Sequence, residues 1–245
     1  MVAGGGGRKP GSSPGDREHR ALRTYGRRKG HRLSARQEAL IATLLPEIVV
    51  PVAGEVPDPL AELFRPANVD RVWLEIGFGS GEHLVAQAGL RPGVGLIGCE
   101  PYVNGVARLL SEIEERGLAN VRIHAGDARV LMAWLPAGSI SRCFILFPDP
   151  WPKARHLKRR LITAAFLSGL ARVMAPGGEL RIATDIGDYA RTTLLALRRS
   201  ADFAWLAESP IDWRERPAGW PSIRYERKAV AAGRRCTYLR LRRRD

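Results

Sequence analysis

The residues best suited to chemistry stand in a proline-rich stretch at residues 147–160. Asp149 lies between two prolines there, and Trp151 follows directly after the second. Prolines restrict the backbone, so we expect this stretch to hold the Asp149 carboxylate in a rigid, extended loop. The residues that follow are crowded with basic side chains, namely Lys153, Arg155, His156, Lys158, Arg159 and Arg160. A fixed carboxylate can stabilise a positive charge as it develops, and a cluster of cations can bind a polyanion.

A helix is predicted to begin within this basic stretch. Apolar residues recur there at helical spacing, at Leu157, Leu161, Ala165 and Phe166. The helix dipole disfavours cations in the first turn, and an anionic partner would offset that cost. Arg155, Lys158 and Arg159 would then share one helical face, as a phosphate-binding surface needs. The alternative is a proline-rich connection followed by a solvated helix start.

A glycine-rich turn at residues 75–81 predicts a second site. Gly77, Gly79 and Gly81 follow an apolar run, and Glu75 stands just before them. The pyrophosphate-binding pattern would place its third glycine at Glu82, where a carboxylate would repel a phosphate. An acid before the turn instead suits a cationic ligand. The pattern therefore favours S-adenosylmethionine, which carries an ammonium and a sulfonium group, over a nicotinamide dinucleotide.

Further acids stand where other predicted strands end. Glu100 follows the second strand, about twenty residues past the glycines, where a carboxylate can accept from both ribose hydroxyls. Asp127 follows the third strand and could accept from an adenine amino group. Capping of helices is the alternative role for both residues. Together with Glu75, Asp149 and Asp185, these acids predict one crevice built from five strands.

Apolar runs alternating with helical patterns predict an α/β fold. We expect buried strands at residues 72–76, 96–99, 121–123, 143–147 and 180–183, with helices on both faces of a mostly parallel sheet. Residues 203–206 and 236–241 are predicted to form an antiparallel pair that closes one edge, separated by a long loop without a helix. Seven strands in all are expected, in a Rossmann-like arrangement.

Charge and composition set the domain organisation and the class of partner. Residues 1–20 are predicted to be a disordered basic tail, residues 21–68 a basic arm with a short helix and a proline-rich connection, and residues 69–245 the catalytic domain. The net charge is +14, and residues 8–36 hold ten Lys or Arg against two acids. This charge favours a nucleic acid partner, because no basic amphipathic helix with an aromatic face accompanies it.

No membrane span, signal peptide or metal-ligand spacing is visible, so we expect a cytoplasmic protein without a metal. The three cysteines lie far apart in the sequence and are expected to be buried thiols. No feature of the sequence indicates an oligomeric state.

The motifs resemble those of the bacterial tRNA (guanine-N7)-methyltransferases. The most specific is the Phe-Pro-Asp-Pro-Trp-Pro-Lys run at residues 147–153 with the Arg-His and Lys-Arg-Arg that follow. The resemblance extends from the Arg-Thr-Tyr-Gly-Arg-Arg run at residues 23–28 to the Arg-Tyr-Glu run at residues 224–226. It implies the class I methyltransferase fold, S-adenosylmethionine, and methylation of N7 of the variable-loop guanosine, position 46 of the tRNA.

The resemblance also implies roles for individual residues. The cofactor positions are Glu75, Gly77, Gly79, Gly81, Glu100, Asp127 and Asp149, and Asp149 is also the catalytic position. The substrate positions are Lys153, Asp185, Ile223, Arg224, Tyr225 and Glu226. The RNA-contacting positions are Arg155, His156, Lys158, Arg159 and Arg160.

One position departs from the family's pattern. A Thr-x-aromatic-Glu motif is usual near the C-terminus, whereas this chain has Ile223 before Arg224, Tyr225 and Glu226. Any hydrogen bond from the Thr side chain is therefore lost, and Ser222 is the nearest hydroxyl that could replace it.

Three other functions are compatible with parts of the pattern. A methyltransferase acting on an exocyclic amine of a base would also carry an Asp-Pro loop after its fourth strand, although the basic continuation favours N7. A noncatalytic RNA-binding protein of the same fold would not need the full set of strand-end acids. A nicotinamide-dependent reductase is disfavoured by the glycine spacing.

Overall fold

The computed structural model describes Gly26 and residues 28–245. The predicted disordered tail at residues 1–20 lies outside the described residues. Within the described part of the chain, no helix is long and apolar enough to cross a membrane.

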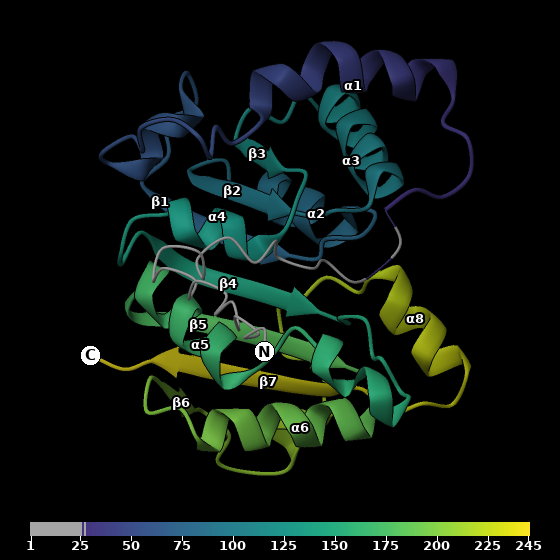
Figure 1. Cartoon of the computed structure of the whole chain (residues 1–245), viewed down its shortest axis with the longest axis vertical. Coiled ribbons are helices and arrows are strands. Elements are labelled where there is room, and N and C mark those ends of the chain that lie inside the picture. Colours follow the sequence, from purple (N-terminus) through teal and green to yellow (C-terminus); the bar gives the residue numbers. More distant parts are fainter. Residues whose placement is uncertain (1–25, 27) are drawn as a thin grey trace, which may run out of the picture.

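Seven strands form one sheet (Figure 1), and their order is β3-β2-β1-β4-β5-β7-β6. The strands are β1 (Arg71–Ile76), β2 (Val94–Cys99), β3 (Val121–His124), β4 (Ile140–Leu146), β5 (Met174–Thr184), β6 (Phe203–Trp205) and β7 (Thr237–Arg243). β1 to β5 are parallel, whereas β7 runs antiparallel to both β5 and β6. The predicted parallel sheet with an antiparallel C-terminal edge is confirmed.

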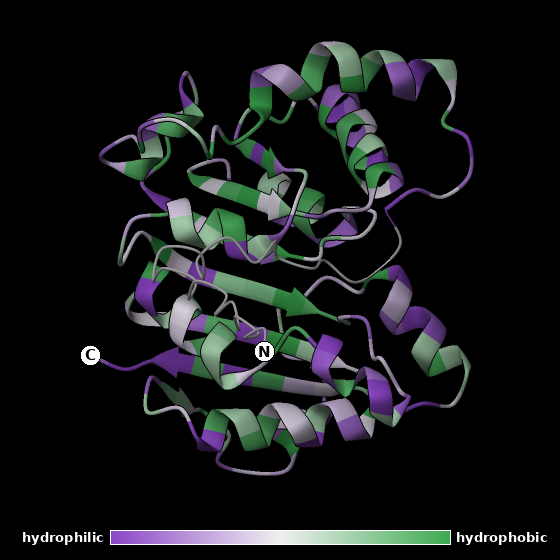
Figure 2. Ribbon diagram, in the orientation of Figure 1, coloured by the Kyte–Doolittle hydropathy of each residue, from purple (hydrophilic) through white to green (hydrophobic). Residues whose placement is uncertain are grey.

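Helices cover both faces of the sheet because strand residues alternate between two hydrophobic cores. On β1, Trp73 packs into one core and Leu74 into the other. The core of Trp73 includes residues of α1 (Ala35–Ile48), α2 (Glu82–Leu90) and α3 (Val103–Arg116). The core of Leu74 includes residues of α4 (Ala128–Trp134), α5 (Ala164–Val173) and α6 (Gly187–Arg198). The central strands are accordingly hydrophobic in Figure 2, and hydrophilic residues gather on α8 (Arg224–Ala231) and at the end of β7.

The strand order places a switch point between β1 and β4. From β1 the chain moves outward to β2 and β3, then returns to β4 and moves outward on the other side. Crossovers that diverge in this way leave a crevice at the carboxyl ends of the two central strands, which is where ligands bind in open α/β sheets. The glycine turn follows β1 and the proline-rich loop follows β4, so the fold brings both predicted sites to that crevice.

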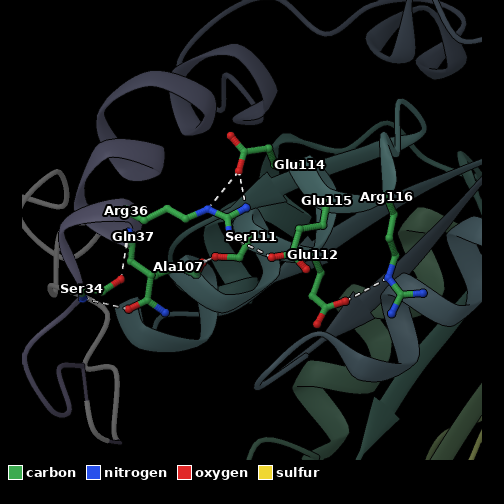
Figure 3. A network of polar contacts seen from close by, with 9 residues as sticks. All are labelled: Ser34, Arg36, Gln37, Ala107, Ser111, Glu112, Glu114, Glu115 and Arg116. Carbon is green, nitrogen blue, oxygen red and sulfur yellow. Dashed lines mark hydrogen bonds and ion pairs between the residues drawn. The ribbon is translucent and has the colours of Figure 1, made fainter.

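The segment from α1 to the 3-10 helix η2 (Leu60–Phe64) packs onto this sheet. Leu40 of α1 lies in one core, and Phe64, at the end of η2, is fully buried in the other. A polar network on the surface also joins α1 to α3 (Figure 3), in which the Arg36 guanidinium pairs with Glu114 at 2.7 Å and with Glu115 at 3.0 Å. These two ion pairs are exposed, so the stability of the contact comes mainly from the apolar side chains.

Two predictions of secondary structure are wrong. The sequence predicts no helix between β6 and β7, but the structure has α7 (Ile211–Arg214) and α8 there. Both helices are short, and α8 is too polar to give a clear apolar stripe. The basic segment is predicted to begin a long helix, but it forms the 3-10 helix η3 (Ala154–Arg159), and α5 begins separately at Ala164. Thr163 starts α5, because its side chain accepts a hydrogen bond from Phe166 N.

Candidate active site

The glycine turn after β1 forms one wall of a cavity of about 870 Å³. Gly77, Gly79 and Gly81 have φ angles of 76°, 58° and 81°, a region that glycine adopts without strain. α3 packs directly against this turn, since a Cβ on Gly105 would lie 2.1 Å from the carbonyl oxygen of Gly79. The backbone of the turn is thereby fixed beside the space that a ligand would occupy.

Glu100, just past the end of β2, lies opposite this turn. Its Oε2 accepts from Gly79 N at 2.9 Å, and its Oε1 accepts from Tyr102 N at 3.0 Å. Burial raises the pKa of the Glu100 carboxyl, and these two backbone hydrogen bonds act in the opposite direction. Each oxygen still has a lone pair, and the side chain lines the cavity. The arrangement fits a carboxylate that accepts two hydroxyl groups.

Asp127 has the capping role considered from the sequence, and it also lines the cavity. It is the N-cap of α4, and its Oδ1 accepts from Arg129 N at 2.9 Å. Its Oδ2 also pairs with the Arg129 guanidinium at 2.6 Å. Asp127 and Arg129 both line the cavity. The side chain is therefore held in place by the helix that it caps.

Glu75, near the end of β1, is buried and in contact with His83. Its Oε2 lies 2.7 Å from His83 Nδ1, and both side chains line the cavity. His83 is not predicted from the sequence. A histidine near the start of a helix gives no signal by itself, because its pairing with Glu75 depends on the turn between them.

The loop that follows β4 carries unusual backbone strain. Phe147 and Trp151 have φ angles of 51° and 42°, values that residues with a Cβ rarely adopt. Each such residue costs roughly 1–3 kcal/mol and persists only where its surroundings hold it. The two strained residues flank Asp149, which lines the cavity. Burial raises the pKa of the Asp149 carboxyl above its ordinary value.

Arg160 holds this loop, and the prediction that it contacts RNA needs correction. The residue is buried, and its Nε donates to the carbonyl oxygen of Pro150 at 3.0 Å. The rest of the guanidinium donates to Asp188 and to Thr192 of α6, at 2.7 and 2.8 Å. With its donors used inside the protein, Arg160 is a structural residue that fixes the loop to α6.

The other basic residues of the segment are exposed or near the surface. Arg155 and Lys158 are three residues apart on η3, so they share a face of this 3-10 helix. The Arg159 guanidinium lies over the Trp151 ring at 4.9 Å, and the His156 ring meets the edge of Trp151 at 5.7 Å. Desolvation, followed by the charges of the neighbouring cations, lowers the pKa of His156. Lys153 immediately precedes η3 and is also exposed.

The structure accounts for Ile223 in the C-terminal motif. Ile223 is the N-cap of α8, and Glu226 is the third residue of that helix. Thr and Glu at this spacing form a capping box, so the family's usual motif has the form of a helix start. Here the Ile223 side chain makes no capping bond. Glu82, the first residue of α2, replaces it by accepting from Arg224 N at 2.6 Å.

Glu226 and Asp185 are committed to other protein groups. Glu226 is buried, accepts from the Tyr238 hydroxyl, and lies 3.3 Å from the Arg216 guanidinium. Asp185 pairs with Arg234 at 2.7 Å. Tyr225, in contrast, is about half exposed and lies beside Gly79 at the cavity.

Gly26 of the basic arm lies at the same cavity. A Cβ on Gly26 would lie 3.4 Å from Asp149 Oδ2, which places the arm beside that carboxylate. Asn104 fastens the arm to α3, because its Oδ1 accepts from Gly30 N and its Nδ2 donates to the carbonyl oxygen of His31, both at 2.7 Å. Gly26 and Asn104 are not predicted from the sequence either, since a contact between residues so distant along the chain leaves no local pattern.

The cavity thus gathers most, but not all, of the predicted site residues. Those that line it are Glu75, Gly77, Gly79, Glu100, Asp127, Asp149, Lys158, Arg159, Arg160, Ile223, Arg224 and Tyr225. Gly81, Lys153, Arg155, His156, Asp185 and Glu226 are outside this lining. Among the described residues, no group of three or more His, Cys, Asp or Glu side chains is arranged to hold a metal ion.

Comparison with solved structures supports the fold. The 16S rRNA methyltransferase KamB aligns with a TM-score of 0.54 and 17% identity, over 78% of this chain and 96% of its own. The aminoglycoside resistance methyltransferase NpmB1 aligns with a TM-score of 0.52 and 19% identity, over 78% and 95%. At such low identity, these similarities bear on the fold alone.

Sequence comparison is far more specific. Residues 70–239 match the family model described as "Putative methyltransferase". A tRNA (guanine-N(7)-)-methyltransferase of Rhodopseudomonas palustris strain BisA53 is 52% identical, over 89% of this chain and 87% of the relative. The proteins of the same name from Bradyrhizobium diazoefficiens and Rhodospirillum rubrum are 50% and 51% identical, over 93% and 91% of this chain and 96% and 88% of theirs. This similarity confirms the resemblance seen in the motifs, and the chain belongs to the family of the bacterial tRNA (guanine-N(7)-)-methyltransferases.

Proposed function

We propose that this protein transfers a methyl group from S-adenosylmethionine to N7 of a guanosine in tRNA, at position 46 of the variable loop. The observation that carries the proposal is the position of Asp149. Its carboxylate is exposed at the rim of the cavity and is held on a strained loop, with the strand-end acids in the same cavity and the exposed Arg155 and Lys158 on η3. The names of relatives about 50% identical to this chain support the same reaction.

The residues of the cavity fit S-adenosylmethionine. Glu100 would accept from the ribose hydroxyls, since each of its oxygens has only one backbone donor. Asp127 lines the cavity at the start of α4 and would accept from the adenine amino group. Glu75 offers a buried carboxylate to the ammonium group. S-adenosylmethionine supplies a methyl group on a positively charged sulfur, and the protein has to bring the acceptor nitrogen into line with it.

Guanine N7 has an exposed lone pair and needs no deprotonation before it attacks. Positioning and electrostatics should therefore provide most of the acceleration. The product base carries a positive charge on its imidazole ring, and Asp149 would stabilise that charge as it forms. Tyr225, about half exposed beside the glycine turn, is the candidate for stacking on the base. Neither Asp185 nor Glu226 lines the cavity; Asp185 is the better candidate acceptor for the guanine N1 and N2 hydrogens, because it is only partly buried whereas Glu226 is buried.

The direct test is tritium-methyl transfer to unmodified tRNA, followed by strand cleavage specific for N7-methylguanosine. We expect incorporation of one methyl group per tRNA, with cleavage at position 46. Incorporation without such cleavage would point to an exocyclic amine as the acceptor. Binding of both ligands without incorporation would point to a noncatalytic protein.

Asp149→Asn should lower kcat on the order of 10²-fold or more, because it keeps the shape of the side chain and removes the charge that stabilises the product ring. Affinity for tRNA should change little, since the charge on the base develops only as the methyl group moves. Single-turnover methylation at saturating substrates measures the effect. A rate within about threefold of wild type, a barrier difference below roughly 1 kcal/mol, would leave Asp149 with only a structural role.

The pH dependence of the same reaction provides an internal control. Only the ionised carboxylate stabilises a positive charge, so kcat should fall as the pH drops through the pKa of Asp149. Burial raises this pKa, so the fall should be centred above the ordinary value of 3.8. The Asn variant should lack this fall.

Replacing Arg155 and Lys158 by Ala should raise KM for tRNA and flatten its dependence on salt. The slope of log KM against the logarithm of the salt concentration should decrease by up to about 0.9 for each phosphate that the variant no longer binds, if duplex behaviour applies. This pair avoids Arg159, whose contact with Trp151 is part of the loop. The double variant of Arg65 and Arg116 is a matched control, because both are ion-paired and neither lines the cavity. If both double variants change KM and its salt dependence equally, the cations of η3 contribute no more to RNA binding than other surface cations do.

Glu82→Ala should raise KM for tRNA several-fold, because α8 would lose its cap and Tyr225 would no longer be held at the cavity. Adding Ile223→Thr should restore much of the loss, since Thr is a good N-cap and its hydroxyl could accept from the backbone N–H of Glu226. Ile223→Val in the same background is the control, with the shape of Thr and no hydroxyl. Equal behaviour of the Thr and Val variants would exclude capping as the cause.

A further inference from the structure

A chain of four side chains leads from the surface to Glu75 in the cavity. Glu75, His83 and Gln87 are all buried, at 3%, 2% and 1% exposure, and Arg91 lies at the end of the chain. Arg91 Nη1 donates to Gln87 Oε1 at 2.8 Å. Gln87 Nε2 lies 3.2 Å from His83 Nε2, and His83 Nδ1 lies 2.7 Å from Glu75 Oε2. Three buried polar side chains thus form one continuous line.

The direction of each hydrogen bond in this line follows from Arg91. A guanidinium can only donate, so the atom of Gln87 that faces it is the carbonyl oxygen. The amide nitrogen of Gln87 then faces His83 and donates to Nε2, which must be the acceptor. A neutral imidazole that accepts at Nε2 carries its proton on Nδ1. His83 therefore donates to Glu75. The tautomer of its ring is determined by Arg91, acting through Gln87.

The surroundings keep each member in place. The Arg91 guanidinium lies over the Trp73 ring at 5.3 Å, and the His83 ring packs against the Phe144 ring at 4.5 Å between centroids. Gln87 is one helical turn beyond His83 on α2, so the helix itself sets their spacing. The line ends on one oxygen of Glu75, and the other oxygen is left for the cavity.

We propose that His83 and Gln87 are positioning residues for the cofactor, acting through Glu75. The proposal rests on the proposed assignment of Glu75 to the ammonium group of S-adenosylmethionine. The Nδ1–H group of a neutral His83 occupies Oε2, so that Oε1 of an ionised Glu75 faces the ammonium group in a single orientation. A neutral ring matters here, because an imidazolium would place a second cation beside the cationic ligand.

The experiment compares two ligands on two variants at the same position. S-adenosylmethionine carries the ammonium group, whereas 5′-methylthioadenosine keeps the nucleoside and lacks the amino-acid part. His83→Leu removes the donor, and His83→Asn keeps an N–H group close to the position of Nδ1. Calorimetry should show about 10-fold or more weaker binding of S-adenosylmethionine to the Leu variant, and binding within about threefold of wild type to the Asn variant. Affinity for 5′-methylthioadenosine should be unchanged in both.

Other outcomes would overturn the proposal in distinguishable ways. Equal loss of both ligands in the Leu variant would mean general damage to the site. Equal weakness of the Asn and Leu variants would mean that the Nδ1 donor has no role. Wild-type protein that binds neither ligand would instead overturn the proposed cofactor site itself.

A second measurement does not depend on the folding of the Leu variant. In wild-type protein labelled with ¹⁵N-histidine, the ring of His83 should be neutral and protonated at Nδ1, with its signals assigned by their absence in the Asn variant. Gln87→Met should remove the preference of the His83 ring for this tautomer. It should also lower the affinity for S-adenosylmethionine more than the affinity for 5′-methylthioadenosine. A ring protonated at Nε2 in the wild type would overturn the proposal.

Discussion

The guanidinium of Arg160 is the contact on which the geometry of the loop after β4 depends. It joins the carbonyl oxygen of Pro150 to two side chains of α6, and its π face lies over the Tyr189 ring at 5.0 Å. The loop needs such an anchor because two of its residues have strained backbones. A buried cation is costly unless every donor has a partner, and here the loop and α6 provide the partners. The position of Asp149 is therefore determined by α6 as well as by the strand that precedes it.

The two walls of the cavity have opposite character, and this suits a reaction between two differently charged ligands. Carboxylates at the ends of β1, β2 and β3 surround the space proposed for a cationic cofactor. Arg155 and Lys158 of η3 are exposed to solvent, where a phosphate backbone could approach. Asp149 lies where these two regions meet. Its raised pKa reflects partial removal from water, which also strengthens its interaction with any charge formed beside it.

The sequence predicts the features that follow from local pattern. Buried strands such as β1 and β4 are continuous apolar runs, and parallel packing brings the residues at their carboxyl ends together. The cavity accordingly holds Glu75, Glu100, Asp127 and Asp149, whereas the fifth predicted acid, Asp185, lies outside its lining. Contacts between distant segments could not be predicted in this way. Arg160 looks like one more cation in a basic run, because its burial depends on Asp188 and Thr192 of α6. The role of Glu82 likewise depends on α8, which follows more than 140 residues later. His83 gives no signal because its partners are determined by the fold of the glycine turn.

The folding unit of this protein includes α1 and η2 as well as the sheet and its helices. The regular alternation of strands and helices begins near residue 70, and a chain started there would look complete by pattern. Leu40 and Phe64 nevertheless fill the two hydrophobic cores, and Gly26 forms part of the surroundings of Asp149. A shortened enzyme would therefore lose core volume on both faces of its sheet and part of the rim of its active site. The segment from α1 to η2 is therefore part of the same folded unit as the sheet.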